Sequence, residues 1–96
     1  MPSQIKVVLT AQVRDFAARL HPEHRRAVKA ALVALANGRR GDIKPLEEEL
    51  DGLQRLRVGR YRIVFRYLPD GSARCFFMES RRLVYDLLRQ RPDLWD

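Results

Sequence analysis

The amino-acid sequence predicts an α+β fold, in which an N-terminal helical hairpin packs on a small antiparallel sheet and a short C-terminal helix follows. Three observations predict it. Residues 11 to 38 carry two amphipathic helical patterns, residues 53 to 79 alternate apolar and polar side chains as strands do, and helical spacing returns after residue 81. Helices and strands occupy separate parts of the chain, which is typical of segregated layers. A length of 96 residues fits one domain spanning residues 1–96.

The N-terminal half is expected to hold one strand and two helices. Ile5 to Leu9 form a short apolar run typical of a strand, and Thr10 is a suitable N-cap residue. A first helix is predicted from about Ala11 to Leu20. The second is predicted to begin at Pro22, a residue favoured in the first helical turn, and to end at Asn37-Gly38. Both helices have an apolar stripe, so the hairpin needs a surface on which to pack.

The sheet is expected in the C-terminal half, after an irregular connection from Gly38 to Gly52. Three strands are predicted: Gln54–Val58, Tyr61–Leu68 and Ala73–Glu79. The turn Pro69-Asp70-Gly71 separates the last two strands. A final helix is predicted from Arg81 to Arg91, before Pro92.

Charge is distributed unevenly along the chain. The net charge is +7, and residues 53 to 91 hold ten arginines against three acidic residues, whereas residues 1 to 52 are nearly balanced. Arginine binds phosphate through a planar fork of donors and stacks on bases. The electropositive half therefore indicates an anionic partner, with nucleic acid as the first choice.

Other compositional features exclude several classes of function. Cys75 is the one cysteine, so no intrachain disulfide can form, and its apolar neighbours predict a buried thiol. His21 and His24 lack metal-ligand spacing, and we expect no metal. No segment is long and apolar enough to span a membrane and no signal peptide is evident, so we expect a cytoplasmic protein.

The stretch LQRLRVGRYRIVF, residues 53 to 65, predicts a β-hairpin with an arginine face. Gly59 and Arg60 fit a two-residue loop, with glycine suited to the first position of a type II′ turn. That loop places Arg57 opposite Arg62 and Arg55 opposite Val64. The apolar face holds Leu56, Val58, Tyr61, Ile63 and Phe65, and the other face holds Arg55, Arg57, Arg62 and Arg66. Because facing like charges destabilise a sheet, we interpret this face as an anion cradle. A solvated face of arginine stems is the alternative.

The stretch MESRRLVYDLL, residues 78 to 88, is the second candidate motif. Arg81 and Tyr85 are four residues apart and share a helix face, whereas Val84 and Leu88 mark the core side. An arginine at a helix N-terminus opposes the helix dipole, which favours a functional interpretation of Arg81.

At these two motifs the sequence resembles the RelE/ParE superfamily, the toxins of bacterial type II toxin–antitoxin pairs. The matching segments are KPLEEELDGLQRLRVGRYRIVF and ESRRLVYDLL, and the order of elements extends the resemblance over nearly the whole chain. The resemblance to the RelE branch implies a ribosome-dependent endoribonuclease that cuts mRNA in the ribosomal A site. The chemistry would be metal-free and without a cofactor, because the 2′-hydroxyl of the RNA attacks the adjacent phosphate.

The resemblance also implies roles for particular residues. Arg57, Arg62 and Arg81 would stabilise the charge that develops on the phosphate, and Tyr85 would stack on a base, transfer a proton, or do both. Guanidinium groups favour the phenolate form of a neighbouring tyrosine. The residues implied in RNA binding are Arg55, Arg60, Arg66 and Arg82.

The sequence departs from the family pattern at the groups that would transfer protons. Ser80 stands where many relatives have a histidine. Some relatives use a glutamate before the sheet as the base, for which the acidic run from Glu47 to Glu49 offers candidates. Arg55 and Arg57 replace lysines of the founding branch, and arginine is a poor proton donor. The general acid and base therefore stay open.

Two further functions remain as alternatives. A ParE-like inhibitor of DNA gyrase would share the fold without ribonuclease activity, and a nucleic-acid-binding domain without toxicity is the third possibility. The toxin interpretation implies a cognate antitoxin that masks the basic face with a helix or an extended segment. Its other partners would be mRNA and the ribosome.

Overall fold

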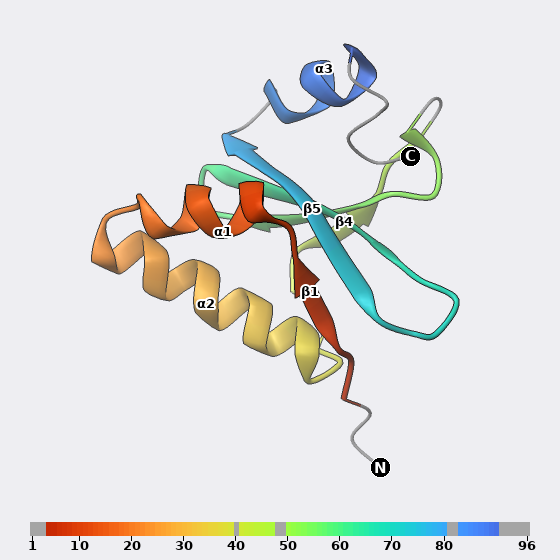
Figure 1. Ribbon diagram of the computed structural model, residues 1–96, viewed down its shortest axis with the longest axis horizontal. Helices are drawn as coiled ribbons and strands as arrows, with labels where there is room; N and C mark the ends of the chain where they lie inside the picture. Colours follow the sequence, from red (N-terminus) through yellow and green to blue (C-terminus); the bar gives the residue numbers. More distant parts are fainter. Residues whose placement is uncertain (1–3, 40, 48–49, 81–82, 91–96) are drawn as a thin grey trace.

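The computed structural model describes residues 4–39, 41–47, 50–80 and 83–90. Two helices, α1 (Ala11–Ala18) and α2 (Pro22–Ala36), lie on one side of a sheet, and α3 (Leu83–Gln90) lies on the other side (Figure 1). The predicted starts of the first two helices are confirmed, and α1 ends two residues before the predicted Leu20. The predicted ends of the last helix, at Arg81 and Arg91, lie outside the described residues. No helix in the described part of the chain is long and apolar enough to cross a membrane.

The sheet has five strands in the order β1-β5-β4-β3-β2. Their bounds are β1 Val7–Leu9, β2 Ile43–Pro45, β3 Gln54–Val58, β4 Tyr61–Tyr67 and β5 Ala73–Ser80. The sheet is mixed rather than wholly antiparallel, because β1 pairs with β5 in parallel while the other pairs are antiparallel. The α+β class is confirmed, and the orientation of β1 corrects the prediction.

Strand β2 forms inside the connection that the sequence predicted to be irregular. Ile43, Lys44 and Pro45 pair with Leu56, Arg55 and Gln54 of β3. Proline has no N–H to donate, which confines it to an edge strand or a strand end, and β2 is the edge of the sheet. Only the pairing with β3 reveals this three-residue strand.

Local signals at the helix ends act partly as predicted. Gly38 adopts a φ of 75° and follows the C-cap residue Asn37, as expected for the end of α2. Thr10 precedes α1, but its hydroxyl donates to the Phe76 carbonyl oxygen at 3.0 Å instead of capping the helix. Thr10 thus ties the start of α1 to β5.

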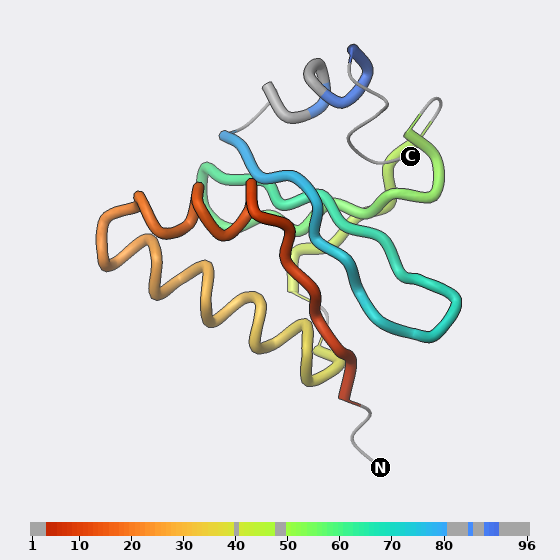
Figure 2. The backbone as a smooth tube through the Cα atoms, in the orientation of Figure 1, coloured from red at the N-terminus to blue at the C-terminus, as the bar shows by residue number. Residues whose placement is uncertain are grey.

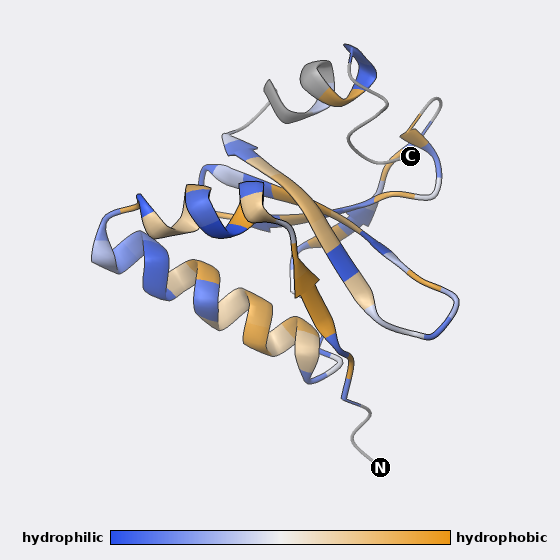
Figure 3. Ribbon diagram, in the orientation of Figure 1, coloured by the Kyte–Doolittle hydropathy of each residue, from blue (hydrophilic) through white to orange (hydrophobic). Residues whose placement is uncertain are grey.

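Each face of the sheet has its own apolar core. The first core lies between the sheet and the helices α1 and α2; its buried members include Val13, Val28, Leu35, Leu56, Ile63 and Phe65. The second core consists of Leu50, Leu53, Val64, Phe76, Phe77 and Leu88, with Leu46 and Tyr85 packed against it. Apolar colouring covers the middle of β5, between a blue band near its start and its blue arrowhead, as expected for a strand whose centre is covered on both sides (Figure 3). The face on which the sequence predicted four arginines is therefore apolar at its centre, around Val64.

The buried thiol of Cys75 gives a direct test of the first core. Cys75 has no exposed surface, and burial raises its pKa to about 12. Because the thiolate is the reactive form, we expect no reaction with a thiol reagent at pH 8 in the native state and stoichiometric labelling after unfolding in urea. Rapid labelling of the native protein would contradict this burial.

Candidate functional site: an arginine-lined pocket

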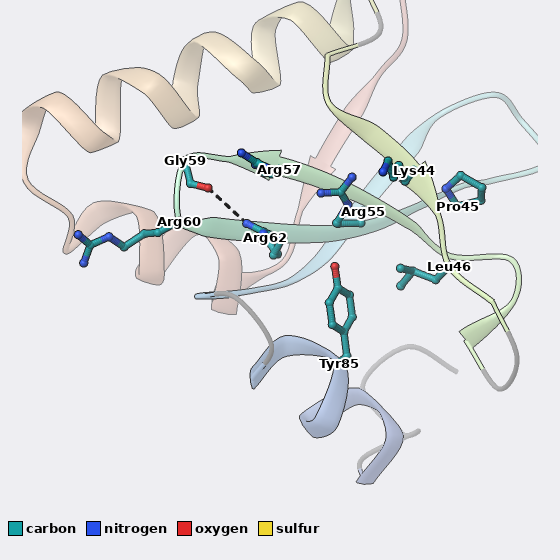
Figure 4. A pocket seen from close by; sticks show the side chains of 9 residues that line it. All are labelled: Lys44, Pro45, Leu46, Arg55, Arg57, Gly59, Arg60, Arg62 and Tyr85. Atoms are coloured by element: carbon teal, nitrogen blue, oxygen red, sulfur yellow. Dashed lines mark hydrogen bonds between the residues drawn. The ribbon is translucent and has the colours of Figure 1, made fainter.

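An open pocket of about 790 Å³ lies where β2, β3 and β4 meet α3 (Figure 4). Nine residues line it: Lys44, Pro45, Leu46, Arg55, Arg57, Gly59, Arg60, Arg62 and Tyr85. The lining joins the arginine face of the β3–β4 hairpin to the tyrosine of the last helix. With several cations around one depression, the ligand best suited to the pocket by charge is an anion.

The β3–β4 hairpin has the predicted register. Val58 pairs with Tyr61 across a two-residue loop, in which Gly59 has a φ of 60°, a value that favours glycine. Arg57 is the direct partner of Arg62, as the sequence predicted. The two-residue loop that begins at Gly59 therefore places two arginines opposite each other on neighbouring strands.

Arg62 is held by the backbone of its own hairpin. Its Nη1 donates to the carbonyl oxygens of Gly59, at 3.3 Å, and Tyr61, at 3.2 Å (Figure 4). Its partner across the strands in β5 is Glu79, whose carboxylate accepts the backbone N–H of Ser80 at 3.0 Å. A guanidinium has five N–H donors, so Arg62 keeps donors for a ligand in the pocket.

Asp42 is a residue of the site that the sequence analysis missed. One carboxylate oxygen lies 3.1 Å from Nη2 of Arg55, and the other lies 3.4 Å from Nε of Arg57. The backbone carbonyl of Asp42 also accepts the N–H of Arg57 at 2.9 Å. Asp42 immediately precedes the unpredicted strand β2, so no sequence signal placed it beside these arginines.

The two arginines of β3 share the contact with Asp42 but differ in exposure. The side chain of Arg55 is only 9% exposed, whereas that of Arg57 is 53% exposed. Burying a guanidinium is costly unless it is paired, and Asp42 supplies the pairing. Arg55 thus forms the charged floor of the pocket, and Arg57 is the more accessible of the two arginines to a ligand.

Replacing Asp42 with asparagine is expected to destabilise the protein by about 2 kcal/mol, because it leaves Arg55 buried without a counter-charge. The loss is smaller than for a fully buried pair, since the Asp42 side chain is 45% exposed. Urea unfolding should show it as a lower midpoint. The matched control is Asp51→Asn, a change at an exposed acid of the same connection. Equal midpoints for both variants would contradict a structural ion pair.

Tyr85 reaches the pocket from α3. Its ring is half-buried against the second core, and its hydroxyl points toward the strands that carry Arg55 and Arg62 (Figure 4). No hydrogen bond to the hydroxyl is found among the described residues. The ring is therefore anchored while the oxygen is free to bind a ligand, an arrangement suited to an aromatic side chain with a polar tip.

Not all predicted site residues meet in the pocket. Arg60 borders it, but its side chain points away from Tyr85 (Figure 4). Arg66 does not line the pocket and instead lies beside Arg74 of β5. Arg81 and Arg82 lie outside the described residues. Lys44 was not predicted, and it joins the site because β2 pairs with β3.

The candidates for proton transfer are arranged as follows. Glu47 is exposed and borders a smaller depression next to the pocket, together with Tyr85. Glu48 and Glu49 lie outside the described residues. His24 accepts or donates a hydrogen bond with the Tyr61 hydroxyl at 3.1 Å and does not line the pocket. Among the residues that the structure describes, no group of His, Cys, Asp and Glu is placed to hold a metal ion.

Comparison with protein-family models gives no match, and comparison with curated proteins gives none either. Solved structures do match. A chain of the RelBE2 toxin–antitoxin complex from Mycobacterium tuberculosis is similar at 26% identity and a TM-score of 0.61, over 84% of this chain and 95% of that one. A YoeB/ParE toxin from Agrobacterium tumefaciens has 18% identity and a TM-score of 0.64, over 80% and 99% of the two chains.

A chain of the RelB–RelE complex from Methanococcus jannaschii is similar at 18% identity and a TM-score of 0.64, over 82% of this chain and 95% of that one. Two helices on one face of a small mixed sheet and a short helix on the other thus define the RelE fold. Together with the 26% identity to the RelBE2 chain, this fold places the chain in the RelE/ParE superfamily.

Proposed function

We propose that the protein is the toxin of a type II toxin–antitoxin pair and acts as a ribosome-dependent, metal-independent mRNA endoribonuclease in the cytoplasm. The observation that carries the proposal is the meeting of Arg57, Arg62 and the Tyr85 hydroxyl around one open pocket. Those groups come from separate elements, and the pocket is the right kind of site for a phosphodiester beside a base.

In the proposed reaction the 2′-oxygen of one nucleotide attacks the adjacent phosphorus and the 5′-oxygen of the next nucleotide leaves. Arg57 and Arg62 donate hydrogen bonds to the non-bridging oxygens, where negative charge accumulates in the transition state. Donors held in place by the backbone need little reorganisation, and Arg62 is held by two carbonyls. We assign Arg81 to the same role by its place in the R-x-x-V-Y motif.

Tyr85 is proposed to take part in proton transfer while its ring flanks a base. Arg55 supports the charge of the pocket from beneath, and Arg60 and Arg82 are proposed to contact the RNA outside it. Glu47, which borders the same small depression as Tyr85, is proposed as the carboxylate that assists as a base. The proposed antitoxin would cover this basic surface, since an acidic segment complements the pocket.

The decisive experiment uses purified protein and ribosomes programmed with a defined codon in the A site. We expect a single new 5′ end within that codon. Cleavage should persist when EDTA removes Mg²⁺ and a catalytically inert cation, such as cobalt hexammine, takes its place in stabilising the ribosome. Intact message under these conditions would contradict the proposal. Inhibition of gyrase supercoiling together with intact message would select the ParE-like alternative, which Ser80 in place of a histidine favours.

A further inference from the structure

The β4–β5 hairpin carries a second pair of facing arginines, separate from the pocket. Arg66 and Arg74 are direct partners in the antiparallel register. Arg66 is half-buried and Arg74 is exposed, and neither lines the pocket. Like charges directly opposite each other destabilise a sheet. This pair therefore lowers the stability of the fold and has no role in the proposed catalytic site.

Within the described part of the chain, neither Arg66 nor Arg74 forms an ion pair with a carboxylate, unlike Arg55 and Arg57, which both lie beside Asp42. The nearest turn, shown at the end of the hairpin in Figure 2, contains Asp70. Its carboxylate accepts hydrogen bonds from the hydroxyl and the N–H of Ser72, which lower its pKa, with a smaller contribution from Lys6. Asp70 is thus committed to its own turn.

The second arginine pair lies on the same side of the sheet as the pocket. Ile63 and Phe65 of β4 face the first core, so Arg62, Val64 and Arg66 face the other way. Arg62 lines the pocket and Val64 packs in the second core with Leu88 of α3. At about 3.3 Å per strand residue, the Cα atoms of Arg62 and Arg66 are ~13 Å apart.

The second core, which includes Val64 of β4 and Leu88 of α3, therefore lies between two cationic sites on one surface. A short RNA strand seated in the pocket does not run on along the sheet to Arg66, because the second core and α3 fill the space between them. A large folded RNA, in contrast, presents phosphates from several strands to one protein surface. Guanidinium forks suit such phosphate contacts.

We propose that Arg66 and Arg74 form a second anion site that binds the phosphodiester backbone of a folded RNA, while the pocket receives the strand to be cut. This proposal rests on the proposed function in taking RNA as the partner. Under that function the folded RNA is part of the ribosome, and the arginine pair contributes to docking and not to the chemical step.

The test is the double variant Arg66→Gln/Arg74→Gln, whose binding to vacant ribosomes and to a five-nucleotide RNA is measured over a range of salt concentrations. Loss of two phosphate contacts should weaken ribosome binding about tenfold near 0.1 M salt and reduce the slope of log K against log salt by about 1.5. Binding of the short RNA should not change. Melting of the variant should be no lower than that of the unaltered protein, because the facing charges are gone.

The matched control is Arg26→Gln/Lys29→Gln, which removes the same charge from exposed positions of α2 on the opposite side of the sheet. An equal loss of ribosome binding in the control, or no loss in the test variant, would overturn the proposal. Ribosome binding that follows the expected pattern without any cleavage would support the second site while refuting the proposed ribonuclease.

Discussion

Arg62→Ala is expected to slow cleavage of the A-site codon by about 10²–10³-fold at saturating ribosomes, the usual effect of removing one fixed donor to a developing oxyanion. Arg62 is suited to this role because two backbone carbonyls orient its guanidinium and Arg57 faces it across the hairpin. The loss should appear in the rate constant of a single turnover, since the interaction strengthens as charge accumulates.

Two controls accompany the Arg62 variant. Arg62→Lys keeps the charge but loses the planar fork, so its rate should lie between those of the alanine variant and the unaltered protein. Arg19→Ala removes an exposed arginine outside the pocket and should leave the rate unchanged. If Arg62→Ala cuts as fast as Arg19→Ala, the pocket is not the catalytic site.

Tyr85→Phe is expected to lower the single-turnover rate constant by about 10²-fold, the lower end of the range for general acid–base catalysis. This variant removes the hydroxyl oxygen and keeps the ring, which packs against the second core. Folding should therefore be nearly unaffected, and any loss of rate reports on the oxygen that points toward Arg55 and Arg62 (Figure 4).

The companion variant Tyr85→Ala separates proton transfer from stacking. It removes the ring as well, so it should weaken RNA binding in addition to slowing the reaction, by an amount typical of one base–aromatic stack, about 1–3 kcal/mol. Full activity in Tyr85→Phe together with a large loss in Tyr85→Ala would show that Tyr85 stacks on a base and transfers no proton.

The β3–β4 hairpin shows how far local sequence information reaches. Its strands have the predicted bounds at Gln54, Val58 and Tyr61, and the pairing of Arg57 with Arg62 is confirmed. A two-residue loop with glycine fixes the register of the two strands, and the alternating pattern fixes which face is buried. Residues close together in the sequence therefore determine the structure of this hairpin. The starts of α1 and α2 were also predicted correctly, because the residues at the first turn of each helix signal them locally.

Long-range packing decided the features that the sequence analysis missed. The sequence analysis predicted no apolar core on the arginine face, yet Val64 and Phe77 are buried there against Leu88 of α3 and the connection before β3. That core divides the arginines of one sheet face, so that Arg62 lines the pocket and Arg66 pairs with Arg74 beyond it.

The sequence by itself determined the α+β class, the helices, the arginine hairpin and the basic character of the surface proposed to bind the partner. Helix propensity, turn geometry and charge act over a few residues. Only the tertiary structure decided the parallel pairing of β1, the edge strand β2 and the ion pairs of Asp42 with Arg55 and Arg57. These contacts join segments that are distant in the chain, and they form because each buries apolar surface or pairs a buried charge that no neighbour in the sequence satisfies.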